Sequence, residues 1–283
     1  MNSGFVDEAL EGFGENPDVS RAAIPTGYEG IDDAIGGFEA GKLYLIGGRP
    51  AMGKSTLAYN LMLNMGLKHN VISVLFSLET SARVVIRMLV SIMAKIDYGK
   101  ARSGYLDSEE IERIKLCKEM LKKTGMIIND HYYADWWEFI DEFRLICQKE
   151  RARVVFVDYL QLLSNVRAGS TSIVEIGEEI RLLKRIAREE GVAVIILSQL
   201  SRRLESREDK RPKINDFLIS EEAMDEFDCI IGLYRDDYYD CESVMDGNME
   251  VEILRREPCF STVLGFDREY LRFYDFYEWG EQS

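Results

Sequence analysis

The sequence predicts an α/β protein built on a doubly wound, mostly parallel sheet. Short runs rich in Val, Ile and Leu alternate with longer amphipathic stretches, which is the pattern of buried strands joined by helices. A glycine-rich segment joins the first such run to the first long helix. Near the end, two apolar runs follow each other without a helix between them, which predicts a C-terminal antiparallel hairpin. We expect one domain over residues 24–283, preceded by an extension over residues 1–23.

The glycine-rich segment Gly48–Ser55, called the phosphate loop below, fits the pattern G-x-x-x-x-G-K-[ST]. It follows the apolar run Leu43–Ile46 and opens a helix over Thr56–Leu67, which is the context that this motif requires. Its glycines let backbone N–H groups turn inward toward phosphate oxygens, and the helix N-terminus adds a partial positive charge. Lys54 would reach the β- and γ-phosphates, and Ser55 would ligate Mg²⁺. We therefore predict a nucleoside triphosphate site formed by Gly48, Arg49, Pro50, Ala51, Met52, Gly53, Lys54, Ser55 and Thr56.

A glutamate follows the second predicted strand. The apolar run Val71–Phe76 leads to Ser77-Leu78-Glu79, just before a helix over Ser81–Lys95. The carboxyl ends of parallel strands form the edge where ligands bind, so Glu79 could orient and deprotonate an attacking water. It could equally be an acid that stabilises the N-terminus of the helix. The spacing alone leaves both roles open.

Two further strands end in polar residues. Val154–Val157 is followed by Asp158, which is typical of a Walker B strand whose acid holds Mg²⁺ through water. Val192–Leu197 is followed by Ser198-Gln199, and an amide at this edge can contact the γ-phosphate or be an ordinary polar strand end. Arg235 follows the apolar run Cys229–Tyr234 and is a further candidate for the nucleotide site.

The remaining predicted elements complete the sheet and its helices. The tandem residues Trp136 and Trp137 could stack nucleic-acid bases, although such a pair on an amphipathic helix more commonly lies in the core. The other elements are a helical turn at Ile31–Ile35, helices over Asp107–Lys123, Trp136–Glu150 and Ile173–Glu190, a short strand at Met126–Ile128, and the hairpin strands Val251–Leu254 and Thr262–Leu264.

The net charge of −15 is concentrated at the two ends of the chain. Residues 1–23 carry −4 and residues 213–283 carry −13, whereas residues 24–212 carry +2. Acidic surfaces repel nucleic-acid phosphates, so this distribution counts against a broad basic face for DNA. The exception is residues 202–213, called the basic loop below, where six basic side chains lie among three acidic ones. Its composition predicts an exposed loop.

Several classes of protein are disfavoured. No apolar run approaches the roughly 20 residues of a membrane span. The first residues do not combine a basic region with an apolar one, so we expect no signal peptide. The five cysteines are odd in number and lack a C-x-x-C pair, which is typical of a reducing compartment. We therefore expect a cytoplasmic protein without a membrane partner.

Six segments, in this order, resemble one family. Together they are similar to the RecA-like motor domain of DnaB-type replicative helicases, and the resemblance runs from about Ile24 to about Tyr277. One such segment would be weak, but six at matching spacing are specific. The segments are Ile24–Gly27, Gly48–Ser55, Phe76–Glu79, Val157–Leu162, Leu197–Arg202 and Asp209–Pro212.

The resemblance implies a ring hexamer that binds ATP and Mg²⁺ between neighbouring subunits and moves along single-stranded DNA. By this likeness, Glu79 would be the catalytic carboxylate, Asp158 the Walker B acid and Gln199 the sensor of the γ-phosphate, together with Lys54 and Ser55. A helicase, primase or loader protein would be a possible partner. Candidate DNA contacts are Arg167, Arg202, Arg207, Lys210 and Arg211.

The sequence also departs from the family pattern. Only residues 1–23 stand where the family has an N-terminal helical domain, with residues 5–13 as a candidate remnant of its linker helix. The family's D-L-R-E-S-G segment reads Asp216–Glu222 here, with Leu218 in place of Arg and Glu221 in place of Gly. The family's K-Q-R-N-G-P strand, whose basic residues reach the neighbour's ATP site, reads Arg255-Arg256-Glu257-Pro258. Arg255 and Arg256 are the candidates for this role.

Two functions fit these observations. The first, which we predict, is an ATP-hydrolysing helicase motor acting on single-stranded DNA in DNA replication. The alternative is a RecA-fold ATPase that does not translocate and serves as a nucleotide-dependent adaptor for a helicase or loader. Stimulation of ATP hydrolysis by single-stranded DNA distinguishes them.

Overall fold

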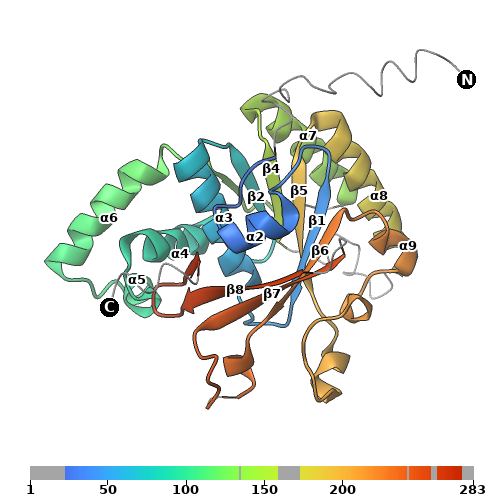
Figure 1. Cartoon of the computed structure of the whole chain (residues 1–283). Coiled ribbons are helices and arrows are strands. Elements are labelled where there is room, and N and C mark those ends of the chain that lie inside the picture. Colours follow the sequence, from blue (N-terminus) through green and yellow to red (C-terminus); the bar gives the residue numbers. More distant parts are fainter. Residues whose placement is uncertain (1–22, 134, 159–172, 241, 256–259, 276–283) are drawn as a thin grey trace, which may run out of the picture.

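The computed structural model describes residues 23–133, 135–158, 173–240, 242–255 and 260–275 (Figure 1). Within these ranges, nine strands form one sheet in the order β3-β2-β4-β5-β1-β6-β7-β8-β9. The strands are β1 (Leu43–Gly48), β2 (Ser73–Ser77), β3 (Ile127–Asn129), β4 (Val154–Asp158), β5 (Ala193–Gln199), β6 (Cys229–Tyr234), β7 (Asn248–Arg255), β8 (Phe260–Asp267) and β9 (Arg272–Asp275).

The sheet is parallel from β3 to β6 and antiparallel from β6 to β9. The predicted fold class is therefore confirmed, but the C-terminal hairpin is part of a larger antiparallel section that includes β9. This last strand is only four residues long and has a charged residue at each end, so its sequence shows no strand pattern and β9 was not predicted. Phe273 fixes it to β8 by stacking on Phe266, with ring centroids 4.4 Å apart.

Helices cover both faces of the sheet (Figure 1). Buried side chains of α2, α3 and α4 share one core cluster, and those of α7, α8 and α9 share a second. Alternate residues of β1 point to opposite clusters: Tyr44 and Ile46 to the first, Leu43 and Leu45 to the second. The helices are α2 (Glu29–Ile35), α3 (Lys54–His69), α4 (Ala82–Ala94), α5 (Tyr98–Ser103), α6 (Ser108–Leu121), α7 (Trp136–Glu150), α8 (Ile173–Glu190) and α9 (Glu221–Met224).

Some local predictions need correction. The short helices α5 and α9 were not predicted, because neither is long enough to show a helical period. The basic loop is not wholly exposed, since its first five residues form the 3₁₀ helix η3 (Arg202–Ser206) with Leu204 buried. The tandem tryptophans separate: Trp136 packs in the core, whereas Trp137 is 66% exposed.

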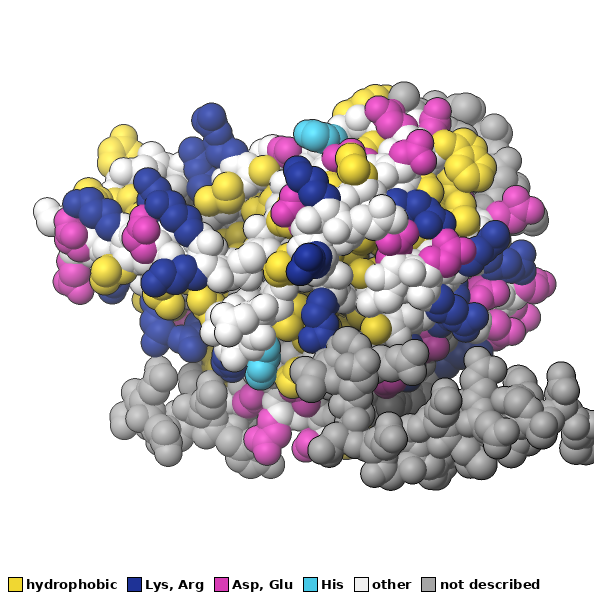
Figure 2. Space-filling view, turned by 90° about the horizontal axis from the view of Figure 1, so that it is seen from above, with side chains coloured by type: hydrophobic (Ala, Val, Ile, Leu, Met, Phe, Trp, Pro, Cys, Tyr) yellow, Lys and Arg dark blue, Asp and Glu magenta, His cyan; other side chains and the backbone are white. Residues whose placement is uncertain are grey.

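The surface carries both signs of charge. On the face seen in Figure 2, basic and acidic side chains intermingle among the described residues. Among the described residues, Cys117, Cys147 and Cys229 are buried and are not joined in disulfides. Within the described ranges, no helix combines the length and the apolar character needed to cross a membrane.

Candidate nucleotide-binding site

The carboxyl ends of β1, β2, β4 and β5 meet at one edge of the sheet, because these strands are parallel and in register. Gly48 lies opposite Gln199, and Ser77 lies opposite Asp158. At this edge the structure forms a cavity of about 320 Å³. The structure thus brings together the five side chains singled out in the sequence. The cavity is lined by Lys54, Ser55, Glu79, Asp158 and Gln199, among others.

The two glycines of the phosphate loop serve different purposes. Gly53 has a φ of 97°, a left-handed conformation that residues with a Cβ rarely adopt, and it precedes the first residue of α3. A Cβ at Gly53 would also lie 3.1 Å from Met249 Cε. At Gly48 the restriction is space, because a Cβ there would lie 3.2 Å from the Cγ atom of Lys54. The loop therefore turns at Gly53 and leaves room for the lysine at Gly48.

Lys54 is held by the loop itself. Its Nζ donates hydrogen bonds to the carbonyl oxygens of Gly48 and Arg49, at 2.9 and 3.1 Å. Burial lowers the pKa of Lys54 to about 8, and the nearby charge of Arg49 acts in the same direction. The carboxylates of Asp158 and Glu79 oppose this shift in the pKa. The ammonium is therefore charged at neutral pH and lies at the cavity wall, where a phosphate would meet it.

Oxygen ligands suited to Mg²⁺ lie beside this lysine. Asp158 is 3% exposed, and burial raises the pKa of its carboxyl group. A hydrogen bond with Ser55 and the charge of Lys54 act against that rise in the pKa. Carboxylate, hydroxyl and phosphate oxygens are the ligands that Mg²⁺ prefers, so the pair Ser55 and Asp158 fits this ion. Glu79 is exposed and lines the same cavity, so its position is compatible with a role in orienting water.

Other lining residues were not anticipated from the sequence. Tyr59, Thr80, Val84 and Met88 also line the cavity. Tyr59 follows Ser55 by one helical turn of α3, and Met88 follows Val84 by one turn of α4, so each pair shares a helix face. This helical spacing is the signal by which they could have been found. They give the cavity a partly apolar wall.

Two arginines expected at the nucleotide site have side chains that point elsewhere. Arg49 is buried and donates hydrogen bonds to Glu205 and to the carbonyl oxygen of Leu200. Arg235 is also buried and pairs with Asp237, and its Nη1 donates to the Ala51 carbonyl at 3.5 Å. Neither side chain lines the cavity. In this structure both contact the protein around the phosphate loop and not the space that a nucleotide would fill.

Comparison with known proteins identifies the family. The family described as the DnaB-like helicase C terminal domain matches residues 23–275. The chain belongs to this family. It is 32% identical over 261 residues to the replicative DNA helicase DnaB of Geobacillus stearothermophilus, covering 91% of this chain and 58% of that protein. It is 33% identical over 253 residues to the replicative DNA helicase DnaC of Bacillus subtilis, covering 88% and 56%.

Solved structures show the same fold. One solved ATPase domain matches with a TM-score of 0.86 and 30% identity, over 97% of this chain and 98% of that one. The structure of a DnaB-like replicative helicase and its interactions with primase matches with a TM-score of 0.85 and 31% identity, over 96% and 67%. The chain thus corresponds to the ATPase domain and spans under two thirds of the two bacterial helicases. None of these relatives supports the adaptor alternative.

Two arginines of the basic loop that we predicted to contact DNA form ion pairs with carboxylates of the same chain. Arg207 forms two hydrogen bonds of 2.8 Å with the buried carboxylate of Asp216. Arg211 forms two with Glu250, at 2.7 and 2.8 Å, and lies over the ring of Tyr234. These two predicted DNA contacts are therefore engaged by carboxylates of the same chain.

The remaining DNA candidates differ from one another. Lys210 lies over the ring of Tyr239, with Nζ 5.2 Å from the centroid. Arg202 is exposed and has no ion-pair partner among the described residues. Arg167 lies outside the described residues, as does the candidate helix over residues 5–13. Of the described candidates, Arg202 is the arginine that remains open to a ligand.

The C-terminal departures from the DnaB pattern include exposed apolar and acidic side chains. Leu218 is 50% exposed, and Glu221 and Glu222 occupy the first turn of α9, where they suit the helix dipole. Arg255 donates to the Met224 carbonyl at 2.7 Å and pairs with Asp225 at 2.9 Å. This finger candidate is thus bound within its own chain, and Arg256 lies outside the described residues.

Proposed function

We propose that this chain is the ATP-hydrolysing motor domain of a DnaB-type helicase, acting on single-stranded DNA in DNA replication. One observation carries the proposal: Lys54, Ser55, Glu79, Asp158 and Gln199, from four neighbouring strand ends, line one cavity behind a phosphate loop. Membership of the DnaB-like family and the likeness to a solved ATPase domain support the same conclusion. ATP and Mg²⁺ are the cofactors that this set of side chains fits.

Each side chain has a defined role in this proposal. Lys54 would bind the β- and γ-phosphates, while Ser55 and Asp158 would hold Mg²⁺. Glu79 would orient the attacking water and accept its proton. Gln199 would contact the γ-phosphate at the end of β5, directly before the segment that leads to the basic loop. Bound ATP supplies the phosphoryl group whose transfer to water yields ADP and phosphate.

The proposal extends to assembly and partners. We infer a homo-oligomeric ring, with Arg255 or Arg256 reaching the ATP site of a neighbour. Arg255 would have to leave Asp225 and the Met224 carbonyl to do so, because both occupy its guanidinium here. We also propose contact with a helicase, primase or loader protein, and a cytoplasmic location.

Steady-state ATP hydrolysis at low salt, with and without single-stranded DNA, tests this function. We expect turnover that rises with DNA, and a loss of about 10²–10³-fold in Lys54→Ala, because a charge that stabilises the transferring phosphoryl group is gone. Equal turnover in Lys54→Ala would mean that another site hydrolyses ATP. Hydrolysis that does not respond to DNA, in an assembled protein, would contradict the helicase motor and favour the adaptor.

A further inference from the structure

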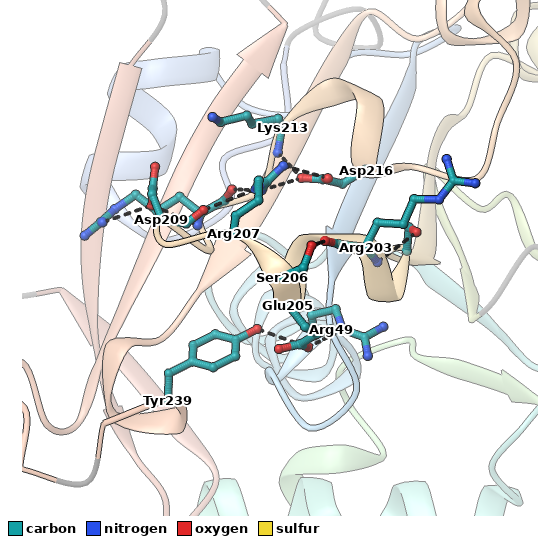
Figure 3. A network of polar contacts seen from close by, with 11 residues as sticks. Arg49, Arg203, Glu205, Ser206, Arg207, Asp209, Lys213, Asp216 and Tyr239 are labelled. Atoms are coloured by element: carbon teal, nitrogen blue, oxygen red, sulfur yellow. Dashed lines mark hydrogen bonds and ion pairs between the residues drawn. The ribbon is translucent and has the colours of Figure 1, made fainter.

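An ion pair joins the phosphate loop to the basic loop. Arg49 Nε donates to Glu205 Oε1 at 2.7 Å, and Arg49 Nη1 donates to the Leu200 carbonyl at 2.7 Å. The hydroxyl of Tyr239 donates to the same Glu205 oxygen at 3.4 Å. Figure 3 shows these side chains turned toward one another. The Arg49 side chain is 10% exposed and that of Glu205 is 35% exposed, so a buried guanidinium meets a half-buried carboxylate.

Arg49 belongs both to this ion pair and to the contact that holds Lys54. The Arg49 carbonyl accepts a hydrogen bond from Lys54 Nζ, while the Arg49 side chain is fixed by Glu205. The neighbouring Gly48 carbonyl accepts from both Lys54 Nζ and the Leu200 backbone N–H. The backbone against which Lys54 rests is therefore fixed from the side of the basic loop.

We propose that Glu205 is a positioning residue for the nucleotide site: through Arg49 it sets the geometry of the phosphate loop around Lys54. Glu205 and Arg49 do not line the cavity, so they act on the nucleotide through the loop. A preorganised loop binds phosphate more tightly because less order has to be imposed when the ligand arrives. Loss of the pair should therefore weaken nucleotide binding.

The same short helix also faces outward. Arg202 and Arg203 lie on η3 with Glu205, and both are exposed without an ion-pair partner among the described residues. Figure 3 shows Arg203 extending away from the other labelled side chains. If DNA binds as proposed above, its phosphates would meet these arginines on the outer side of η3. Glu205, on the inner side, would then couple bound DNA to the phosphate loop.

The chain offers a matched control. Arg211 and Glu250 form a second ion pair of similar length, 2.7 Å, which anchors the other end of the basic loop to β7. No hydrogen bond in the described residues connects either of them to the phosphate loop. If loose anchoring of the basic loop were enough to disturb nucleotide binding, Glu250→Gln would act like Glu205→Gln.

The first experiment measures the ADP dissociation constant of the full chain without DNA. We expect Glu205→Gln and Arg49→Ala each to raise this constant roughly 5- to 10-fold, which corresponds to the net free energy of one ordinary hydrogen bond. Arg49→Lys keeps the charge but loses the separate Nε and Nη1 donors, so its dissociation constant should lie between those of the wild type and Arg49→Ala. The double variant Arg49→Ala/Glu205→Gln should be no weaker than Arg49→Ala alone.

Two results would overturn the proposal. One is an unchanged ADP dissociation constant in Glu205→Gln, with thermal unfolding like that of the wild type. The other is an equal rise in Glu250→Gln, which we expect to stay within about twofold of the wild type. Since Gln has nearly the shape of Glu, folding should survive the substitution, and the unfolding curve checks that it does.

The second experiment measures coupling, and this step rests on the proposed function. Saturating single-stranded DNA should change ADP affinity by a factor on the order of 5, and by linkage ADP should change DNA affinity equally. In Glu205→Gln we expect this factor to fall close to 1. If DNA still changed the ADP affinity of Glu205→Gln as much as that of the wild type, the coupling role would be contradicted. If the wild type binds no DNA, the proposed function fails at that point, while the DNA-free measurement still decides the role of Glu205.

Discussion

The cavity edge and the basic loop lie side by side, yet they treat their charged groups in opposite ways. At the cavity edge, Asp158 is buried and Lys54 is half-buried, and both line an open cavity. Desolvation lowers the pKa of Lys54 and raises that of Asp158, so it favours the uncharged form of each. In the basic loop, Arg207 and Arg211 are already bound to Asp216 and Glu250. The charged groups of the cavity edge remain open to a ligand, whereas two of the six cations of the basic loop are paired with carboxylates of the same chain.

This difference shows why counting basic residues is a poor guide to a DNA surface. Six basic side chains in residues 202–213 suggested one local patch. A guanidinium that forms two bonds with a carboxylate has few donors left and little net field to attract phosphate. In the described loop this leaves Arg202 and Arg203 as the arginines without an ion-pair partner.

The largest effect that would test the contrast is at Glu79. We expect Glu79→Gln to lower ATP turnover by about 10²–10⁴-fold while ADP affinity changes little, because the amide cannot accept the proton of water. Glu221→Gln, at the first turn of α9 and away from the cavity, should leave turnover unchanged. Turnover near that of the wild type in Glu79→Gln would instead favour the role of a helix N-terminal acid.

A smaller effect separates the two kinds of arginine in the basic loop. Arg207→Ala should lower the free energy of unfolding by about 2 kcal/mol, because the buried Asp216 loses its partner. This is below the cost for a fully buried pair, since Arg207 is 28% exposed. Arg202→Ala should change the free energy of unfolding by less than about 0.5 kcal/mol, because no ion pair is lost. Urea unfolding of both variants measures this, and equal losses would break the distinction.

The pH dependence of ADP binding sharpens the description of the cavity edge. Only protonated Lys54 attracts phosphate, and burial lowers its pKa to about 8 in the free protein. We therefore expect affinity to be level below this pH and to fall as pH rises through it, by about tenfold per pH unit at most. In Lys54→Arg the guanidinium stays protonated, so the fall in ADP affinity near pH 8 should disappear, even if the affinity is lower throughout. A fall in ADP affinity near pH 8 that persists in this variant would be caused by the titration of another group.

Much of the cavity could be predicted, because it depends on local patterns. Gly48–Ser55 is a contiguous motif, and Glu79, Asp158 and Gln199 each follow a buried strand whose carboxyl end must reach the same sheet edge. The partners in the basic loop could not. Arg211 and Glu250 are 39 residues apart, and Arg49 and Glu205 are 156 apart. Such pairs depend on which segments lie side by side in three dimensions, and no periodicity in the sequence records that.

The short elements were missed for a different reason. Helix α9 has four residues and is fixed by its cap, Ser220, whose hydroxyl accepts from the Ala223 N–H. Strand β9 is held by cross-strand pairing with β8 and by the stacked ring of Phe273. Both owe their structure to neighbours rather than to their own composition, so a pattern along the chain contains too little signal to predict them.

A titration of ATP turnover with single-stranded DNA at low salt tests the central claim most directly, with the wild type, Arg202→Ala/Arg203→Ala and Arg211→Ala compared. We predict that the wild type responds to DNA and that the double variant keeps its DNA-free turnover. The double variant should need about tenfold more DNA for half-maximal stimulation, because two phosphate contacts are lost. Arg211→Ala should shift that concentration much less. The reverse order would contradict the account, because it would mean that the internally paired arginine, and not the open ones, carries the contact with DNA.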